Sequence, residues 1–330
     1  MTAAVGRIGG QAWLMDAWKT MLRIRRAEEA VARMVESGEA RCPCHLYIGQ
    51  EAIAAGVCAA LTREDTIWGG HRSHGHYLAK GGSLEAMFAE ILGKETGCSG
   101  GRGGSMHLTD PSHGIPGTVP IVAATVPLAV GAALAYKMRQ EGRVAVAFFG
   151  DGTLEEGHVH ESLNLAALYR LPVIFVCENN LYASHMHWSE RRVADNLHQA
   201  GVFHSVPGER LDGNDVTAVR EAARRAVDLA REGGGPTLLE CRTFRWRGHV
   251  GSSFDLDVGV QRRGELSSWL LQDPLARVEQ ELGESAERTE VSEEIAREVE
   301  QALDAARRAP PRRAVRMMDH VFVTEAACGR

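Results

Sequence analysis

The chain begins with a long stretch in which apolar and polar positions follow a helical period. Between Trp13 and Val35 the apolar residues recur at spacings of three and four, so they share one face of a helix. This pattern predicts a helix over about 11–36 that ends at Ser37-Gly38, because Gly38 can adopt the left-handed conformation common after a helix C-terminus.

The segment 93–117 has a different composition, with eight glycines among its 25 residues. Arg102, His107 and His113 stand between those glycines. Flexible linkers are usually rich in glycine and serine without histidines, so we expect an ordered loop rather than a linker. Because glycine lets the backbone come close to another group, we expect this loop to approach a ligand or a partner.

From about 126 onward, helical and strand patterns take turns along the chain. Residues 144–149 (VAVAFF) and 173–178 (VIFVCE) are short, mostly apolar runs typical of buried strands, and a helical pattern over 159–170 joins them. A strand, a helix and a strand with short joints predict a βαβ crossover, which makes the two strands parallel. Further helices are predicted over 126–138 and 214–232, and a further strand over 237–244.

The C-terminal part of the chain returns to helices. Beyond about 284, an apolar stripe runs from Ile295 to Leu303, as in an amphipathic helix that packs on a domain. We therefore expect one α/β domain over 1–330, built on a parallel β-sheet flanked by helices. A helical N-terminal segment over about 11–36 and a helical C-terminal extension over about 270–330 complete this expectation.

Composition narrows the classes of protein to which the chain can belong. Hydrophobic residues make up 44% and charged residues 24% of the 330, as in globular proteins that bury a core. The 43 Asp and Glu outnumber the 37 Lys and Arg, so the net charge is −6 and we expect no nucleic-acid partner. Because the sequence has no long apolar run and no signal pattern, we expect neither membrane insertion nor secretion. Seven cysteines without regular spacing favour reduced thiols and a cytoplasmic location.

The most informative polar residues follow two of the predicted strands. Gly150-Asp151-Gly152 comes at the carboxyl end of the first, and Asn180 follows the second, twenty-nine residues after Asp151. Parallel α/β sheets bind ligands at this edge, and the crossover brings both residues to it. A carboxylate, an amide oxygen and backbone carbonyls suit Mg²⁺ when phosphate oxygens complete the octahedron. A lone GDG is more often a tight turn, but the two strands and the paired Asn179-Asn180 favour the metal site.

The segment 150–183 resembles the motif of the thiamine-diphosphate-dependent enzymes, which begins with GDG and ends with NN about thirty residues later. Within that group the chain looks like the alpha subunit of the decarboxylating component of 2-oxo acid and acetoin dehydrogenase complexes. Four stretches carry this narrower resemblance: HLYIGQEA (45–52), HRSHGHYLAKGG (71–82), GCSGGRGGSMHL (97–108) and FFGDGTLEEGHVHESLN (148–164). This resemblance extends over about 20–250, and it implies the thiamine-diphosphate-binding fold with thiamine diphosphate and Mg²⁺ as cofactors.

The resemblance assigns the diphosphate and the metal of the cofactor to this chain. It implies that Asp151 and Asn180 bind Mg²⁺ through their side chains, and Tyr182 through its backbone carbonyl. A guanidinium suits a phosphate because its planar donor fork matches phosphate oxygens. The other residues implied at the cofactor are Gly150, the backbone donors Gly152 and Thr153, His71 and Arg72 at the diphosphate, and the apolar contacts Ile121 and Val122.

The resemblance also implies two catalytic histidines. His74 and His249 match family histidines near the reacting carbon, where an imidazole can donate or accept a proton near neutral pH, and His249 also contacts the cofactor. The sequence departs from the family after His249. Val250 stands where mitochondrial relatives carry a regulatory serine, so phosphorylation at that position is not expected. The unusual segment 184–192 (SHMHWSERR) is expected to border the substrate entrance.

The resemblance also implies partner subunits, because it accounts for only part of the cofactor site. It covers the diphosphate and metal half of the cofactor site, so a beta subunit is implied, in an α2β2 heterotetramer with the cofactor at the interface. The implied reaction is oxidative decarboxylation or cleavage, with transfer of the acyl group to a lipoyl-bearing acyltransferase or carrier domain. Two alternatives stay open: a ketol transferase or carboligase that uses a different acceptor, and a non-catalytic scaffold subunit.

Overall fold

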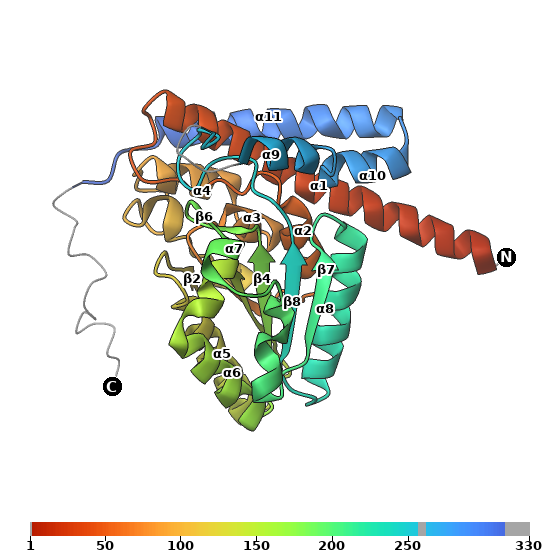
Figure 1. Ribbon diagram of the computed structural model, residues 1–330. Helices are drawn as coiled ribbons and strands as arrows, with labels where there is room; N and C mark the ends of the chain where they lie inside the picture. The colour runs from red at the N-terminus through yellow and green to blue at the C-terminus, as the bar shows by residue number, and fades with distance from the viewer. Residues whose placement is uncertain (1, 257–261, 314–330) are drawn as a thin grey trace.

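A six-stranded parallel sheet forms the centre of the computed structural model, which describes residues 2–256 and 262–313 (Figure 1). Its strand order is β2-β1-β3-β4-β8-β7, and every neighbouring pair is parallel. The strands are β1 (Thr66–Gly69), β2 (Gly117–Thr118), β3 (Ala145–Gly150), β4 (Val173–Asn179), β7 (Gly208–Asp212) and β8 (Thr237–Arg242). A short antiparallel hairpin of β5 (Tyr182–Ala183) and β6 (Met186–His187) follows β4. The predicted parallel α/β architecture is confirmed.

Helices pack on both faces of this sheet and across one end of it (Figure 1). The α-helices are α1 (Thr2–Glu36), α2 (Glu51–Cys58), α3 (His74–Ala79), α4 (Leu84–Ile91), α5 (Thr125–Arg139), α6 (Gly157–Leu168), α7 (Trp188–Arg191), α8 (Val216–Arg231), α9 (Arg262–Leu270), α10 (Pro274–Leu282) and α11 (Ala286–Arg308). Short 3₁₀ turns are η1 (Gly104–Met106), η2 (Pro111–His113), η3 (Asp151–Glu155) and η4 (Leu197–His204). Within the described residues, no helix is long and apolar enough to cross a membrane.

The unbroken apolar strands are explained by two cores, one on each face of the sheet. In β3, Val146 and Phe148 point into the larger core, which also contains residues of α1, α2 and α8. Ala147 and Phe149 point to the opposite face, where α5 and α6 cover them. Because successive side chains of a strand alternate between faces, a strand covered on both sides must be apolar at every position.

The two ends of the described chain pack against each other. Helices α1 and α11 lie side by side across the end of the sheet (Figure 1). Arg23 pairs with Glu298 at 2.9 Å, and Arg33 pairs with Glu300 at 2.7 Å. Helix α1 begins at Thr2, earlier than the predicted start near residue 11. The predicted C-terminal extension is helical through α11, and its last part, 314–330, lies outside the described residues.

The glycine-rich segment is ordered, as predicted, and it wraps around a carboxylate of the chain itself. Glu90 in α4 is fully buried, and its two oxygens accept the backbone N–H groups of Ser99 (2.8 Å), Gly101 (2.8 Å), Gly103 (2.6 Å) and Gly104 (3.1 Å). A side chain at Gly97 would collide with Glu90, since its Cβ would lie 2.3 Å from a carboxylate oxygen. The close approach made by these glycines is therefore to Glu90.

Replacing Glu90 with alanine should strongly destabilise the chain. The variant leaves four partly buried N–H donors without an acceptor, and an unsatisfied donor that is fully buried costs roughly 1–3 kcal/mol. We expect the free energy of unfolding in urea to fall by about 3 kcal/mol or more. Glu85→Ala is the matched control, because Glu85 is exposed on the same helix and its loss should cost less than about 1 kcal/mol. Equal stability of the two variants would contradict the account of this loop.

Candidate active site

A cavity of about 370 Å³ opens at the carboxyl ends of β3 and β4. This is the edge at which open parallel sheets bind ligands. The predicted site residues that line it are His71, Arg72, Ile121, Val122, Gly150, Asp151, Gly152, Thr153, Asn180, Tyr182 and His249. Of the predicted site residues, only His74 lies outside this lining. Ser184, at the start of the unusual segment 184–192, also lines the cavity.

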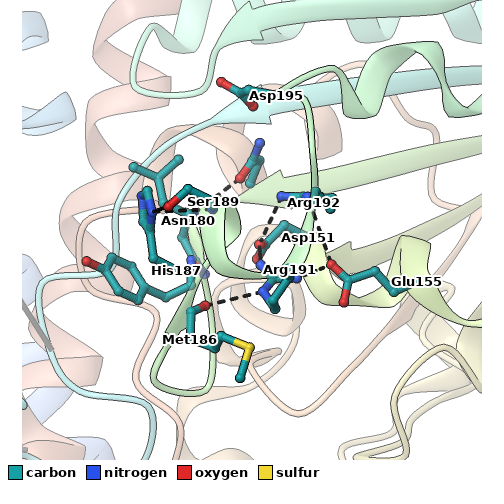
Figure 2. A network of polar contacts seen from close by, with 12 residues as sticks. Asp151, Glu155, Asn180, Met186, His187, Ser189, Arg191, Arg192 and Asp195 are labelled. Carbon is teal, nitrogen blue, oxygen red and sulfur yellow. Dashed lines mark hydrogen bonds and ion pairs between the residues drawn. The ribbon is translucent and has the colours of Figure 1, made fainter. Parts of the chain in front are cut away.

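Asp151 and Asn180 follow neighbouring strands and lie close together beside this cavity (Figure 2). Both are buried, with 1% of Asp151 and 6% of Asn180 exposed. The Asn180 side chain is held at both ends: its Nδ2 donates to Gln50 Oε1 at 2.9 Å, and its Oδ1 accepts the Tyr182 N–H at 3.3 Å. The parallel crossover thus brings together the carboxylate and the amide that the sequence places far apart.

Two arginines that follow the hairpin converge on the Asp151 carboxylate (Figure 2). Arg191 donates hydrogen bonds to Oδ2 of Asp151 and to Oε1 of Glu155. Nη2 of Arg192 lies 3.6 Å from the same Asp151 oxygen. Both arginine side chains are largely buried. Positive charge therefore already offsets the cost of burying this carboxylate.

The donor groups and charges of the cavity fit a Mg²⁺ diphosphate. A carboxylate and an amide oxygen are the hard ligands that Mg²⁺ prefers. The Asp151 carboxylate already binds the positively charged side chains of Arg191 and Arg192. Arg72 is 94% buried and donates to the backbone carbonyls of Leu46 (2.6 Å) and His249 (3.1 Å). Among the described residues, no carboxylate forms an ion pair with Arg72. A buried guanidinium of this kind is suited to a phosphate group.

Three imidazoles meet at the cavity wall. The ring of His45 lies 4.7 Å from that of His71 and 5.0 Å from that of His249, measured between centroids. Burial, with Arg72 nearby, lowers the pKa of His45 to about 3, of His71 to about 2 and of His249 to about 4. All three are neutral at physiological pH. Their nitrogens are close enough to share a metal ion, but the positive charges of Arg72 and Arg245 oppose a cation there.

The comparison with known proteins decides the family. A family model described as "Dehydrogenase E1 component" matches residues 19–314. The chain belongs to this family. Membership confirms the resemblance seen in the sequence, and it implies that this E1 chain depends on thiamine diphosphate.

Curated relatives of this E1 chain are alpha subunits. It is 37% identical over 326 residues to the pyruvate dehydrogenase E1 component subunit alpha-3 of Arabidopsis thaliana, covering 96% of this chain and 76% of the relative. Identity to the alpha subunit of acetoin:2,6-dichlorophenolindophenol oxidoreductase of Bacillus subtilis is 45% over 232 residues, covering 70% of each. The chain is 40% identical over 303 residues to the pyruvate dehydrogenase E1 component subunit alpha of Zymomonas mobilis, covering 90% of this chain and 85% of the relative.

His74 and His76 take different places in this E1 chain. His74 is fully buried; its Nδ1 lies 3.0 Å from Glu28 Oε2 and its Nε2 2.8 Å from Ser105 Oγ. Burial opposes its charge, but Glu28 raises the pKa of His74. His76 lines the cavity instead, with its Nε2 2.8 Å from Glu178. A catalytic role for His74 stays a prediction.

Sequence reasoning missed the polar network behind the cavity. Glu178 lines the cavity and accepts a hydrogen bond from the Tyr47 hydroxyl, although both side chains are buried. One signal was present: Glu178 is the only charged residue in the predicted strand 173–178. The segment 184–192, unusual in sequence, contains Arg191 and Arg192, but their contact with Asp151 could not be predicted because it depends on how the hairpin folds back.

Proposed function

We propose that this E1 chain is the alpha subunit of a pyruvate-like 2-oxo acid dehydrogenase or of an acetoin dehydrogenase. It binds the diphosphate end of thiamine diphosphate together with Mg²⁺. The observation that carries the proposal is that Asp151, Asn180 and Arg72 line one cavity at the edge of the sheet. Relatives named as pyruvate dehydrogenase and acetoin oxidoreductase subunits support this substrate class.

Side chains and backbone divide the task of binding the cofactor. Asp151 and Asn180 would hold Mg²⁺ by their side chains, and Tyr182 by its carbonyl. The diphosphate would be held by His71 and Arg72 and by the backbone of Gly152 and Thr153. The rest of the cofactor site would be lined by Gly150, Ile121 and Val122. The crowding at Gly152 supports a backbone role, because a Cβ there would come 2.8 Å from that of Ala183.

His249 is the residue best placed to move a proton. When bound, thiamine diphosphate supplies an electron sink for breaking the bond beside the substrate carbonyl. The neutral His249 imidazole lines the same cavity, and its backbone N–H donates to Asp255 Oδ2 at 2.7 Å. This hydrogen bond fixes the segment that carries the ring. The unprotonated ring nitrogen can then accept a proton at the reacting group and return it.

A second subunit is needed to complete the site. Alpha subunits of this family generally pair with beta subunits, and we propose an α2β2 assembly with a lipoyl-bearing acyltransferase as the acceptor. Ile121 and Val122 line the cavity, yet they are 68% and 47% exposed. Exposed apolar side chains beside a polar cavity support a partner that covers them. The cytoplasmic location stays a prediction, as does the expectation that neither nucleic acid nor a membrane is a partner.

Reconstitution with a candidate beta chain tests the proposed function. The pair should be assayed with a panel of 2-oxo acids, acetoin and sugar ketols, using a lipoyl domain, dichlorophenolindophenol or an aldehyde as acceptor. We expect turnover of a 2-oxo acid or acetoin only when both chains and thiamine diphosphate are present. Turnover of ketols alone with an aldehyde would favour the transferase or carboligase alternative. Full activity of the lone chain would refute the shared site.

Removing Arg191 should strengthen metal binding in the absence of the cofactor. Its guanidinium is bonded to Asp151, so a metal ion must displace it, and a competing cation lowers apparent affinity. We expect Arg191→Ala to bind Mn²⁺, a spectroscopic substitute for Mg²⁺, about tenfold more tightly by titration calorimetry or electron paramagnetic resonance. Arg224→Ala, on the exposed face of α8, is the control. Unchanged or weaker Mn²⁺ binding would show that Arg191 does not compete with a metal.

A further inference from the structure

Two cysteines that come just before His45 in the chain lie close enough together to react with each other. Cys42 and Cys44 are separated by Pro43, and their Sγ atoms are 4.0 Å apart. Both are free thiols. A disulfide requires sulfurs about 2.05 Å apart, a distance that rotation of the two side chains and a small backbone shift could provide. We propose that Cys42 and Cys44 are a redox-sensitive pair that forms an intrachain disulfide on oxidation by a peroxide.

The surroundings of Cys42 assign it the role of the attacking thiol. Cys42 is half-buried and lines a surface groove that contains both acidic (Glu39 and Glu90) and basic (Arg41, Lys94 and Arg307) residues. The Ser105 backbone N–H donates to its sulfur at 3.4 Å. The neighbouring Cys44 lowers the pKa of Cys42 to about 6, against the effect of burial. Accessible cysteines that ionise near neutral pH are the ones that react with peroxides.

Cys44 is placed to resolve the first oxidation product. It is 1% exposed, and its thiol donates to the Cys42 carbonyl at 3.4 Å, so it stays beside its partner. The hydrogen bond with the adjacent Cys42, together with burial, raises the pKa of Cys44, so its thiol remains protonated while Cys42 reacts. A buried thiol next to an accessible one is the arrangement that captures an oxidised sulfur before it reacts further.

The proposed reaction needs only the peroxide as oxidant. The Cys42 thiolate attacks one oxygen of hydrogen peroxide, the O–O bond breaks, and a sulfenic acid and one water are formed after uptake of a proton. The Cys44 sulfur then attacks the sulfenic sulfur, its proton leaves with the hydroxyl as a second water, and the S–S bond forms. The net change is two thiols plus hydrogen peroxide giving one disulfide plus two waters. Excess dithiothreitol reverses it by thiol exchange.

Two contacts connect this pair with the cavity. The Cys44 carbonyl accepts the Gly251 N–H at 2.8 Å, which ties it to the segment after His249. His45, the residue after Cys44, lines the cavity and touches the rings of His71 and His249. Closing the bridge draws residues 42–44 together, and we expect this to shift both neighbours. The effect on turnover rests on the proposed function, whereas formation of the bridge does not.

The test uses the chain assembled with its beta subunit, exposed to hydrogen peroxide, alkylated and digested with trypsin. The peptide 42–63, which also contains Cys58, should carry one alkyl group instead of the three of the unoxidised chain, and fragmentation should place the bridge between Cys42 and Cys44. Before oxidation, iodoacetamide should modify Cys42 about tenfold faster than the half-buried Cys98 at neutral pH. A bridge to Cys58, or equal alkylation rates, would overturn the assignment.

Variants separate the bridge from its consequence. Cys42→Ser should resist peroxide inactivation, and Cys44→Ser should accumulate a Cys42 sulfenic acid that dimedone traps. Cys58→Ala should oxidise like the unmodified chain, because Cys58 is buried and burial raises its pKa to about 12. A bridge that forms without loss of turnover would refute the connection to the cavity. An assembly without turnover on any substrate would count against the proposed function, while the mass measurement would still decide the bridge.

Discussion

Asp151→Ala should abolish Mg²⁺-dependent binding of thiamine diphosphate to the assembled complex. The substitution removes the carboxylate that we assign to the metal, and Asn180 cannot replace its charge. We expect affinity to fall by at least about a hundredfold, which corresponds to roughly 2.7 kcal/mol. Titration calorimetry with and without Mg²⁺ measures this loss directly.

A matched pair of controls keeps this result interpretable. Asp151→Asn retains the shape of the side chain while removing its charge, and its thermal unfolding shows whether Arg191 and Arg192, left with Glu155 as their carboxylate partner, disturb the fold. Asp228→Ala removes an exposed carboxylate on α8 and should leave cofactor binding unchanged. If both Asp151 variants bind the cofactor as tightly as the unmodified chain, the metal assignment is wrong.

His249→Ala should lower kcat by about a hundredfold to ten-thousandfold, the usual contribution of a positioned acid or base. Cofactor affinity should change by much less, because Asp151, Asn180 and Arg72 remain in place. Single-turnover kinetics of the reconstituted pair, together with a binding titration, separate these two quantities. The exposed His107, which lies outside the lining of the cavity, provides the control His107→Ala. Loss of cofactor binding with unchanged kcat at saturation would reverse the proposed role.

The two central strands, and the sheet edge at which both end, could be predicted from the sequence because the apolar pattern of each strand is strong. The runs 144–149 and 173–178 are almost entirely apolar, and both became central parallel strands within one residue of the predicted bounds. The predicted helices 126–138, 159–170 and 214–232 also formed, with ends shifted by one or two residues. Asp151 and Asn180 met at the sheet edge because β3 and β4 are parallel neighbours, so their carboxyl ends lie at the same edge.

Other parts of the fold carried no periodic signal. Every residue of α2 is buried, so it has no polar face from which a helical period could be read. The partner of the glycine-rich segment could not be identified either, since many carboxylates could accept its N–H groups and only tertiary packing selects Glu90. The contrast between His74 and His76 has the same cause: a difference of two residues on a short helix decides which ring meets the cavity.

The packing of α11 on α1 has a consequence for the order of synthesis. The apolar side chains of α11 (Ile295, Val299 and Leu303) belong to the same core as those of α1. Helix α1 is therefore made about 250 residues before α11 begins. Over that interval of translation part of the apolar surface of α1 stays uncovered, so the nascent polypeptide depends on protection from aggregation until α11 has been made.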